Sequence, residues 1–241
     1  MTQSHPLPVA IVTGASRGFG KAVTAALLDR GWIVVGDARR EIDLKTTAAE
    51  LDSTRLIAIP GDVTDASHRD ALVAAAVDAG PLRLLVNNAS RLGPSPQPAL
   101  ADYPASELWA VYQTNVFAPL ALIQASLPAL TANGGAIVNL SSDAAVEPYP
   151  GWGGYGSSKA ALDQLSAVLA AETAVAPAVP VYAFDPGDMR TEMHQAAFPG
   201  EDISDRAEPG SVVPALLHLL DTRPPAGRYR AADLALSGAR P

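Results

Sequence analysis

Short runs of Val, Ile and Leu alternate along the chain with longer, Ala-rich segments whose apolar residues recur at helical spacing. The short runs predict buried strands at residues 9–13, 32–36, 56–60, 82–87, 136–141, 180–185 and 229–236. The longer segments predict helices at residues 18–30, 66–79, 104–130, 155–173 and 212–220. Continuous apolar strands that alternate with helices are typical of a parallel sheet covered on both faces. The pattern therefore predicts an α/β fold with three layers, a doubly wound parallel sheet.

No shift in composition along the chain marks a boundary between domains. The proline-rich stretch 93–98 is too short to link two domains, so residues 1–241 are expected to form one domain. Residues 188–209 contain Gly, Pro and acidic side chains without clear periodicity. A loop of this length is unusual in a compact domain, and we expect it to form a lid over a substrate site.

Composition excludes several classes of function. The chain has no cysteine, which removes disulfide and thiolate chemistry, and its net charge of −8 disfavours nucleic acid and anionic membranes as partners. The four histidines are scattered, so no metal site is expected. Neither a membrane span nor a signal peptide is predicted, and a cytoplasmic location is expected.

A glycine-rich turn follows the first predicted strand. Gly14, Gly18 and Gly20 permit tight turning and close approach of the backbone to a pyrophosphate. The helix that begins near Gly18 would direct its N-terminal amides and positive dipole at the phosphates. This turn predicts a binding site for a dinucleotide.

A second motif lies in the later half of the chain. Tyr155 and Lys159 are four residues apart and therefore share one face of the predicted helix, and Ser142 lies thirteen positions before the tyrosine. A nearby ammonium favours phenolate, which a tyrosine with an ordinary pKa near 10 seldom forms at neutral pH. Tyr155 would then act as general acid or base while Ser142 holds the substrate carbonyl. Ser141 is the competing hydroxyl, but the spacing selects Ser142.

In these motifs the chain resembles the short-chain dehydrogenase/reductase family, in its single-domain branch. The resemblance rests on residues 13–20, Asp62-Val63, Asn87-Asn88-Ala89, Asn115, Ser142, Tyr155, Lys159, Pro186-Gly187 and Thr191, which span most of the chain. It implies a Rossmann fold with about seven parallel strands. It also implies hydride transfer between a nicotinamide cofactor and a carbonyl or secondary alcohol. Residues 104–130 and 155–173 often pair between subunits in relatives, so a homo-oligomer, a tetramer or a dimer, is expected.

The resemblance assigns roles residue by residue. Catalysis would use Asn115, Ser142, Tyr155 and Lys159, with Asn115 supporting a water that relays protons to the lysine. The cofactor would contact Gly14, Ser16, Arg17, Gly18, Phe19, Gly20, Arg39, Asp62, Val63, Asn88, Ala89, Tyr155, Lys159, Pro186, Gly187 and Thr191. One departure is plain: Ser90 stands where the family usually has Gly after Asn-Asn-Ala. Its side chain would narrow the space near the nicotinamide or offer it a hydroxyl.

The choice of cofactor depends on the end of the second strand. An acid there would bind the adenosine ribose of NAD, whereas a basic residue would accept the 2′-phosphate of NADP. Asp37 lies close by, but alignment with the family puts Ala38 at the acid's position and Arg39 after it. Together with Arg17 this favours NADP(H). NAD(H) remains the alternative, with Arg39 and Arg40 as a solvated charge pair.

The substrate would be a small carbonyl or alcohol compound. Its pocket is expected to be mostly apolar, with walls from Ser90, Arg91, Leu92, Tyr149, Trp152, Met189, Met193, His194 and Phe198. The main rival from another class is a nucleotide-sensing regulator without catalysis. Such a protein should lack the tyrosine or the lysine, and this chain has both.

Overall fold

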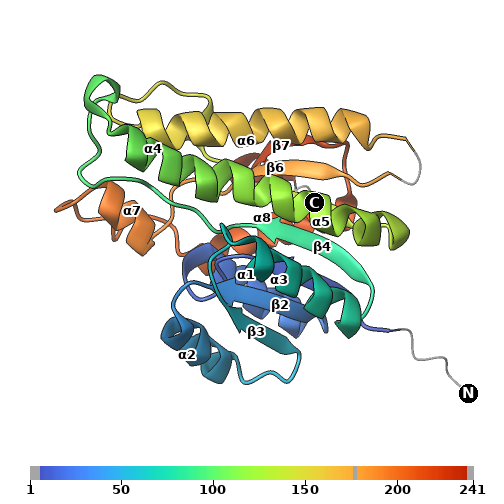
Figure 1. Ribbon diagram of the computed structural model, residues 1–241. Helices are drawn as coiled ribbons and strands as arrows, with labels where there is room; N and C mark the ends of the chain where they lie inside the picture. Colours follow the sequence, from blue (N-terminus) through green and yellow to red (C-terminus); the bar gives the residue numbers. More distant parts are fainter. Residues whose placement is uncertain (1–5, 176–177, 238–241) are drawn as a thin grey trace, which may run out of the picture.

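The computed structural model describes residues 6–175 and 178–237, and its centre is one parallel sheet (Figure 1). The sheet has seven strands in the order β3-β2-β1-β4-β5-β6-β7. Their bounds are β1 Val9–Val12, β2 Ile33–Ala38, β3 Leu56–Pro60, β4 Leu82–Asn87, β5 Ala136–Leu140, β6 Val181–Asp185 and β7 Gly227–Arg230. The order reverses between β1 and β4, and ligands of such sheets bind beyond the carboxyl ends of the strands at this switch point.

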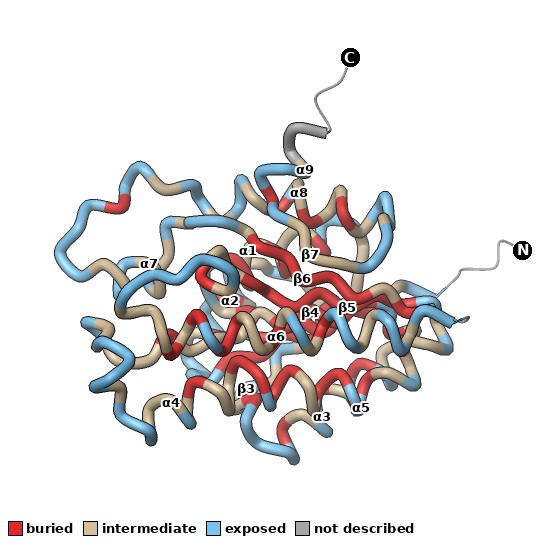
Figure 2. The backbone as a smooth tube through the Cα atoms, turned by 90° about the horizontal axis from the view of Figure 1, so that it is seen from above, coloured by how far each residue is buried: buried red, intermediate tan, exposed pale blue. Residues whose placement is uncertain are grey.

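Helices cover both faces of the sheet. One layer contains α1 (Gly18–Asp29), α2 (Glu41–Leu51) and α8 (Pro209–Thr222), and the other contains α3 (Ala66–Ala79), α5 (Ala118–Ala132) and α6 (Gly153–Glu172). Figure 2 shows the buried strands as a central layer between them. The five inner strands, β2, β1, β4, β5 and β6, are mostly buried on both faces, which explains their apolar runs, whereas the edge strands β3 and β7 are only partly buried. The predicted fold class is therefore confirmed.

The segment predicted as one helix at 104–130 has an interruption that positions a polar side chain. It consists of α4 (Ala105–Tyr112), a π-helical turn (Gln113–Phe117) and α5. The turn carries Asn115, which is 1% exposed. By length and composition, Ala105–Ala132 could cross a membrane, which the sequence analysis had not recognised. In this fold it packs along α3, α6 and β4.

Two elements differ from the prediction. The last strand is β7, Gly227–Arg230, and α9 (Ala231–Ser237) occupies most of the range 229–236 that was predicted as strand. Pairing with β6 fixes the register of β7, and the Ala- and Leu-containing sequence after it favours a helix. Helix α2 was missed because only Leu44 and Thr47 are buried in it, too few to give an apolar stripe.

The expected lid, residues 188–209, lies beyond the carboxyl ends of the strands. It contains α7 (Glu192–Ala197), and Met189 pairs with Ala207 in an isolated bridge. Figure 1 shows α7 at one end of the molecule, clear of the sheet. Its role as a lid stays a prediction.

Candidate active site

Glycines allow the turn between β1 and α1 to adopt backbone angles with positive φ. Gly14 has a φ of +68°, which is strained for residues with a Cβ. Gly20 packs beneath it, because a Cβ at Gly20 would overlap the Gly14 carbonyl and the Asn88 side chain. The amide of Gly14 donates to Asp37 Oδ1 at 2.7 Å. The turn therefore begins α1 with its first amides at the strand ends.

Asp37 is buried and committed to internal partners. Its Oδ1 accepts the Gly14 amide, and its Oδ2 lies 3.0 Å from His68 Nε2. Burial raises the pKa of Asp37, and the hydrogen bonds from His68 and Gly14 work against that rise. A Cβ at Gly61 would overlap the His68 ring, so only glycine leaves room for this pair.

Buried hydrogen bonds join the ends of neighbouring strands. Thr13 Oγ1 accepts from the amides of Asn88 and Ala89 at 3.0 and 2.9 Å, and Asn88 Nδ2 donates to the Thr13 carbonyl at 2.8 Å. These bonds tie β1 to the residues after β4. A switch point joined in this way keeps its shape before any ligand binds.

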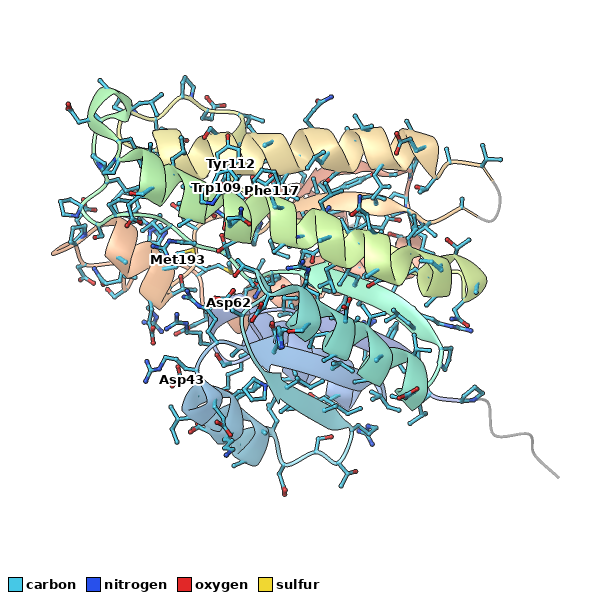
Figure 3. All side chains as sticks on the ribbon, viewed as in Figure 1. Asp43, Asp62, Trp109, Tyr112, Phe117 and Met193 are labelled. Carbon is cyan, nitrogen blue, oxygen red and sulfur yellow. The ribbon has the colours of Figure 1, made fainter. Side chains whose placement is uncertain are left out.

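A cavity of about 790 Å³ opens at this edge of the sheet. Figure 3 shows Met193 and Asp43, two of its lining residues, on the side where α7 and α2 lie. Most of the predicted cofactor residues line it: Gly14, Ser16, Arg17, Gly18, Phe19, Arg39, Val63, Asn88, Ala89, Tyr155, Lys159, Pro186 and Thr191. A glycine turn, helix amides and cations at one cavity suit a dinucleotide phosphate.

Three predicted cofactor residues are not among those that line this cavity. Gly20 supports Gly14 from below, and Gly187 borders a second, smaller cavity. The Asp62 carboxylate accepts from the amide and hydroxyl of Thr64 at 2.9 and 2.8 Å. Its predicted bond to adenine stays a prediction.

Lys159 lies behind Tyr155, at the end of β5. Its Nζ donates to the Leu140 carbonyl at 2.6 Å and lies 5.5 Å from the centre of the Tyr155 ring. Burial lowers the pKa of Lys159 to about 8, and Asp163 partly opposes this. The i,i+4 spacing thus brings both side chains to one cavity.

The expected lowering of the Tyr155 pKa is not produced by the protein alone. Burial raises this pKa instead, and hydrogen bonding to the Ser90 and Ser142 hydroxyls opposes the rise. The carboxylates of Asp185 and Asp143 raise it further. Since desolvation disfavours phenolate, Tyr155 is a neutral phenol at neutral pH, the form that can donate a proton.

The two neighbouring serines point in different directions. Ser142 Oγ donates to Asp143 Oδ1 at 3.0 Å and borders the smaller cavity with Tyr155. Ser141 also lines both cavities, but its Oγ donates to Asp163 Oδ2 at 2.7 Å. Of the two, Ser142 is the hydroxyl presented beside the tyrosine.

Asn115 forms a buried hub rather than a direct contact with Lys159. Its Nδ2 donates to Ser158 Oγ and to the Arg91 carbonyl, both at 2.9 Å. Its Oδ1 accepts the Arg91 amide at 2.8 Å and the Ser90 hydroxyl at 3.2 Å. The π-helical turn supplies this position, since it widens the helix where the side chain turns inward.

Comparison with known proteins identifies the family. The family profile described as short chain dehydrogenase matches residues 8–202. The chain belongs to the short-chain dehydrogenase/reductase family. It is 35% identical over 95% of its length to an uncharacterized oxidoreductase of Saccharomyces cerevisiae, of which it covers 90%. It is 37% identical to a serine 3-dehydrogenase of Agrobacterium fabrum, over 76% of this chain and 72% of the relative.

Solved structures agree with this assignment. A short-chain dehydrogenase from Shigella flexneri, complexed with NADP, superposes with a TM-score of 0.86 at 28% identity. The match covers 95% of this chain and 100% of the other. This short-chain dehydrogenase/reductase is therefore an oxidoreductase by family, with a Rossmann fold that binds a nicotinamide cofactor.

Sequence reasoning missed a charged group behind the site of this dehydrogenase. Arg228 of β7 donates to Asp163 Oδ2, to Asp185 Oδ2 and to the Ser142 carbonyl, at 3.1, 2.8 and 2.9 Å. Asp185 also accepts the Gly187 amide at 3.0 Å. Asp163 could have been suspected, because it lies four residues after Lys159 on the same helix. Arg228 had no such signal.

The second cavity, of about 110 Å³, lies beside Ser142 and Tyr155. Five of the predicted substrate walls border it: Leu92, Trp152, Met189, Met193 and His194. Ser90 and Arg91 line the larger cavity instead. Phe198 makes tilted ring contacts with His194 and Trp152, and Tyr149 packs edge-on against Trp152. The smaller cavity is thus lined by a mixture of apolar, aromatic and acidic residues.

Proposed function

We propose that this short-chain dehydrogenase/reductase is an NADP(H)-dependent carbonyl reductase that also oxidises the corresponding secondary alcohol. The observation that carries the proposal is that Tyr155, Ser142 and Lys159 come together near the end of β5. They border two cavities that share lining residues, one of which could hold the cofactor and the other the substrate. A regulator that only senses nucleotides would have no use for this group.

The side chains divide the chemistry among them. A bound nicotinamide would supply or accept the hydride. Ser142 would donate a hydrogen bond to the substrate oxygen, and Tyr155 would give that oxygen its proton during reduction. The neutral phenol that burial favours suits this direction. Lys159 would bind the nicotinamide ribose hydroxyls and stabilise the phenolate after the proton has left.

The preference for NADP(H) rests on the charges around the larger cavity. Asp37 lines the cavity, but each of its carboxylate oxygens already accepts one internal hydrogen bond, from the Gly14 amide and from His68, which disfavours it as the ribose partner. Arg39 is exposed at the cavity, and no partner for its guanidinium is found within the described part of the chain. Arg17 also lines the cavity, although Glu192 pairs with it. A 2′-phosphate would give the Arg39 guanidinium a charged hydrogen-bond acceptor.

The proposal is tested with a panel of carbonyl substrates, each assayed with NADPH and with NADH. We expect NADPH to bind at least about tenfold tighter, a difference of roughly 1.4 kcal/mol. Arg39→Ala should remove most of this preference by weakening NADPH alone. Arg83→Ala, an exposed arginine outside the cavity, is the matched control. Equal affinity of the wild type for both cofactors would instead favour an NAD(H)-dependent alcohol dehydrogenase.

We also propose that the protein forms a homo-oligomer. Trp109 and Phe117 are 62% and 42% exposed, and together with Tyr112 they form an aromatic cluster on α4 and the π-helical turn (Figure 3). A second copy of the chain would cover this cluster. Sedimentation should show a dimer or tetramer at micromolar concentration, and Trp109→Ser should shift it towards monomer. A wild-type monomer would contradict the proposal.

A further inference from the structure

Nothing in the proposed chemistry yet uses the hydroxyl of Ser90, the residue at which the resemblance described above leads one to expect glycine. It follows β4 and lines the larger cavity together with Tyr155 and Lys159. Hydrogen bonding with the Ser90 hydroxyl opposes the rise that burial causes in the pKa of the Tyr155 phenol, so the two side chains lie near one another in this cavity. The Ser90 hydroxyl also donates to Asn115 Oδ1 at 3.2 Å. One hydroxyl therefore stands between the reacting oxygen and the Asn115 hub.

A serine hydroxyl has one proton and can rotate it between acceptors. While Tyr155 is a phenol, the Ser90 proton can stay on Asn115 Oδ1. Once Tyr155 has given its proton to the substrate, the phenolate is the stronger acceptor, because hydrogen bonds to charged groups are the stronger ones. Rotation would then bring the Ser90 proton to the phenolate, with no proton transferred between residues.

The hub tolerates this rotation. Asn115 Oδ1 also accepts the Arg91 amide at 2.8 Å, so it keeps a donor when the Ser90 hydroxyl turns away. Asn115 itself is held by its bonds to Ser158 and to the Arg91 carbonyl. The rotation therefore leaves no buried polar atom without a partner, which would otherwise oppose it.

We propose that Ser90 is a third hydroxyl of the reaction centre, which stabilises the phenolate of Tyr155 by rotating its proton from Asn115 Oδ1 to the phenol oxygen. The proposal rests on the proposed function, since it assumes that Tyr155 is the proton donor. It assigns to this chain a hydrogen bond that relatives with glycine at the position cannot make. Ser90 acts through Tyr155 and has no separate role in binding.

The kinetic test compares the wild type with Ser90→Ala and with Ser90→Gly, the residue usual in the family. In alcohol oxidation, which requires phenolate, kcat should fall about tenfold at pH 7, and the apparent pKa of kcat should rise by about one unit. KM should change by less than about twofold. The matched control is Ser157→Ala, whose hydroxyl is exposed and bonds only to the Gly154 carbonyl; its profile should equal that of the wild type. Superimposable profiles for Ser90→Ala and wild type would overturn the proposal.

A double-mutant cycle with Tyr155→Phe separates this inference from the proposed function. If Ser90 acts through the phenol, Ser90→Ala should have almost no effect in the Tyr155→Phe background. An equal loss in both backgrounds would reject the role of Ser90 while leaving Tyr155 as the acid. A Tyr155→Phe variant with undiminished turnover would instead reject the proposed function.

The contact itself can be tested without any substrate. The protein is labelled with 3-fluorotyrosine, and the ¹⁹F resonance of Tyr155 is assigned by its absence in Tyr155→Phe. We expect Ser90→Ala to move this resonance at neutral pH and Ser157→Ala to leave it in place. A Tyr155 resonance that stays unmoved in Ser90→Ala would show that the two hydroxyls do not interact, and would overturn the proposal.

Discussion

The two walls of the cleft are held in different ways. On the strand side, the buried residues Thr13 and Asp37 take part in hydrogen bonds, with Asn88 and Gly14, that join β1, β2 and the end of β4. On the opposite side, residues 188–209 are tied to the rest of the protein by the exposed ion pair Arg17–Glu192, by the Ser95 hydroxyl, which donates to the Ala196 carbonyl at 2.6 Å, and by the ring contact between Trp152 and Phe198. Buried bonds are expensive to break, whereas exposed pairs contribute about 0–1 kcal/mol each.

This difference separates two tasks. In the proposed reaction, proton and hydride transfer would need atoms fixed before the substrate arrives, and the buried wall would supply that rigidity. If residues 188–209 act as the predicted lid, substrate entry and product release would need a wall that moves at small cost. The predictions below test whether the division holds, from the largest expected effect to the smallest.

Tyr155→Phe should have the largest effect. It removes the proposed proton donor and leaves the ring, so turnover should fall at least about a hundredfold while folding and NADPH binding are kept. Steady-state rates with any accepted carbonyl, together with a cofactor titration, measure both. Tyr149→Phe is the matched control, since its hydroxyl bonds to Asp143 at the cleft's outer rim, and it should lose far less. Activity of Tyr155→Phe within a few-fold of wild type would place the proton donor elsewhere.

Asp37→Ala tests the rigid wall. It leaves the Gly14 amide and the His68 ring without their acceptor, and each buried donor left unpaired costs about 1–3 kcal/mol. We expect the free energy of unfolding in urea to fall by roughly 2 kcal/mol, with weaker cofactor binding because the Gly14 turn loosens. Asp70→Ala, an exposed carboxylate on α3, should change stability by less than about 0.5 kcal/mol. If Asp37→Ala lowered the free energy of unfolding by as little as Asp70→Ala, the Gly14 turn would not depend on the Asp37 carboxylate.

Burial of the Lys159 ammonium should lower the free energy of unfolding. Its pKa is about 8 in the folded protein and near 10.5 in the unfolded chain, so folding disfavours its charged form. Stability should therefore decrease as pH falls from about 10.5 to about 8, and change no further from this group below that. Lys159→Met should remove this slope and raise the free energy of unfolding at pH 7 by about 1 kcal/mol, after the loss of the bond to Leu140.

Urea unfolding of Lys159→Met at pH 7 and pH 10 provides the measurement, with the exposed Lys45→Met as control. Lower stability than the wild type at pH 7 would mean that the hydrogen bond to Leu140 outweighs the cost of burying the ammonium. Turnover should be lost in either case, because the ammonium is expected to bind the ribose.

Glu192→Gln should have the smallest effect. Arg17 and Glu192 are both more than half exposed, so the loss of their ion pair should change the free energy of unfolding by less than about 0.5 kcal/mol. Because Arg17 becomes free for a phosphate, NADPH affinity should rise by about twofold at low salt and by less at high salt. Fluorescence titrations at two salt concentrations measure this. A destabilisation above 1 kcal/mol would show that the movable wall is as firmly held as the buried one.

The sequence by itself predicted the strands of the sheet, the glycine-rich turn after the first strand, and the motif of Ser142, Tyr155 and Lys159. Each of these features depends on the spacing of residues close together in the chain. Buried strands appear as runs of apolar residues, and Gly14 and Gly20 belong to one turn. Tyr155 and Lys159 lie on the same face of one helix because they are four residues apart. Patterns of this kind can be recognised without knowing the rest of the fold. The last strand was predicted wrongly, because the residue at which β7 ends and α9 begins depends on pairing with β6.

Only the tertiary structure decided which partners these groups have. Asp37 meets His68 because β2 and α3 are brought together, and this bond engages the carboxylate oxygen Oδ2. Arg228 donates to the Ser142 carbonyl although the two residues are 86 positions apart, because β5 and β7 lie on either side of the same strand, β6. The raised pKa of Tyr155 likewise comes from burial, which no spacing reveals. Contacts between distant residues depend on strand order and register, and these exist only in the folded chain.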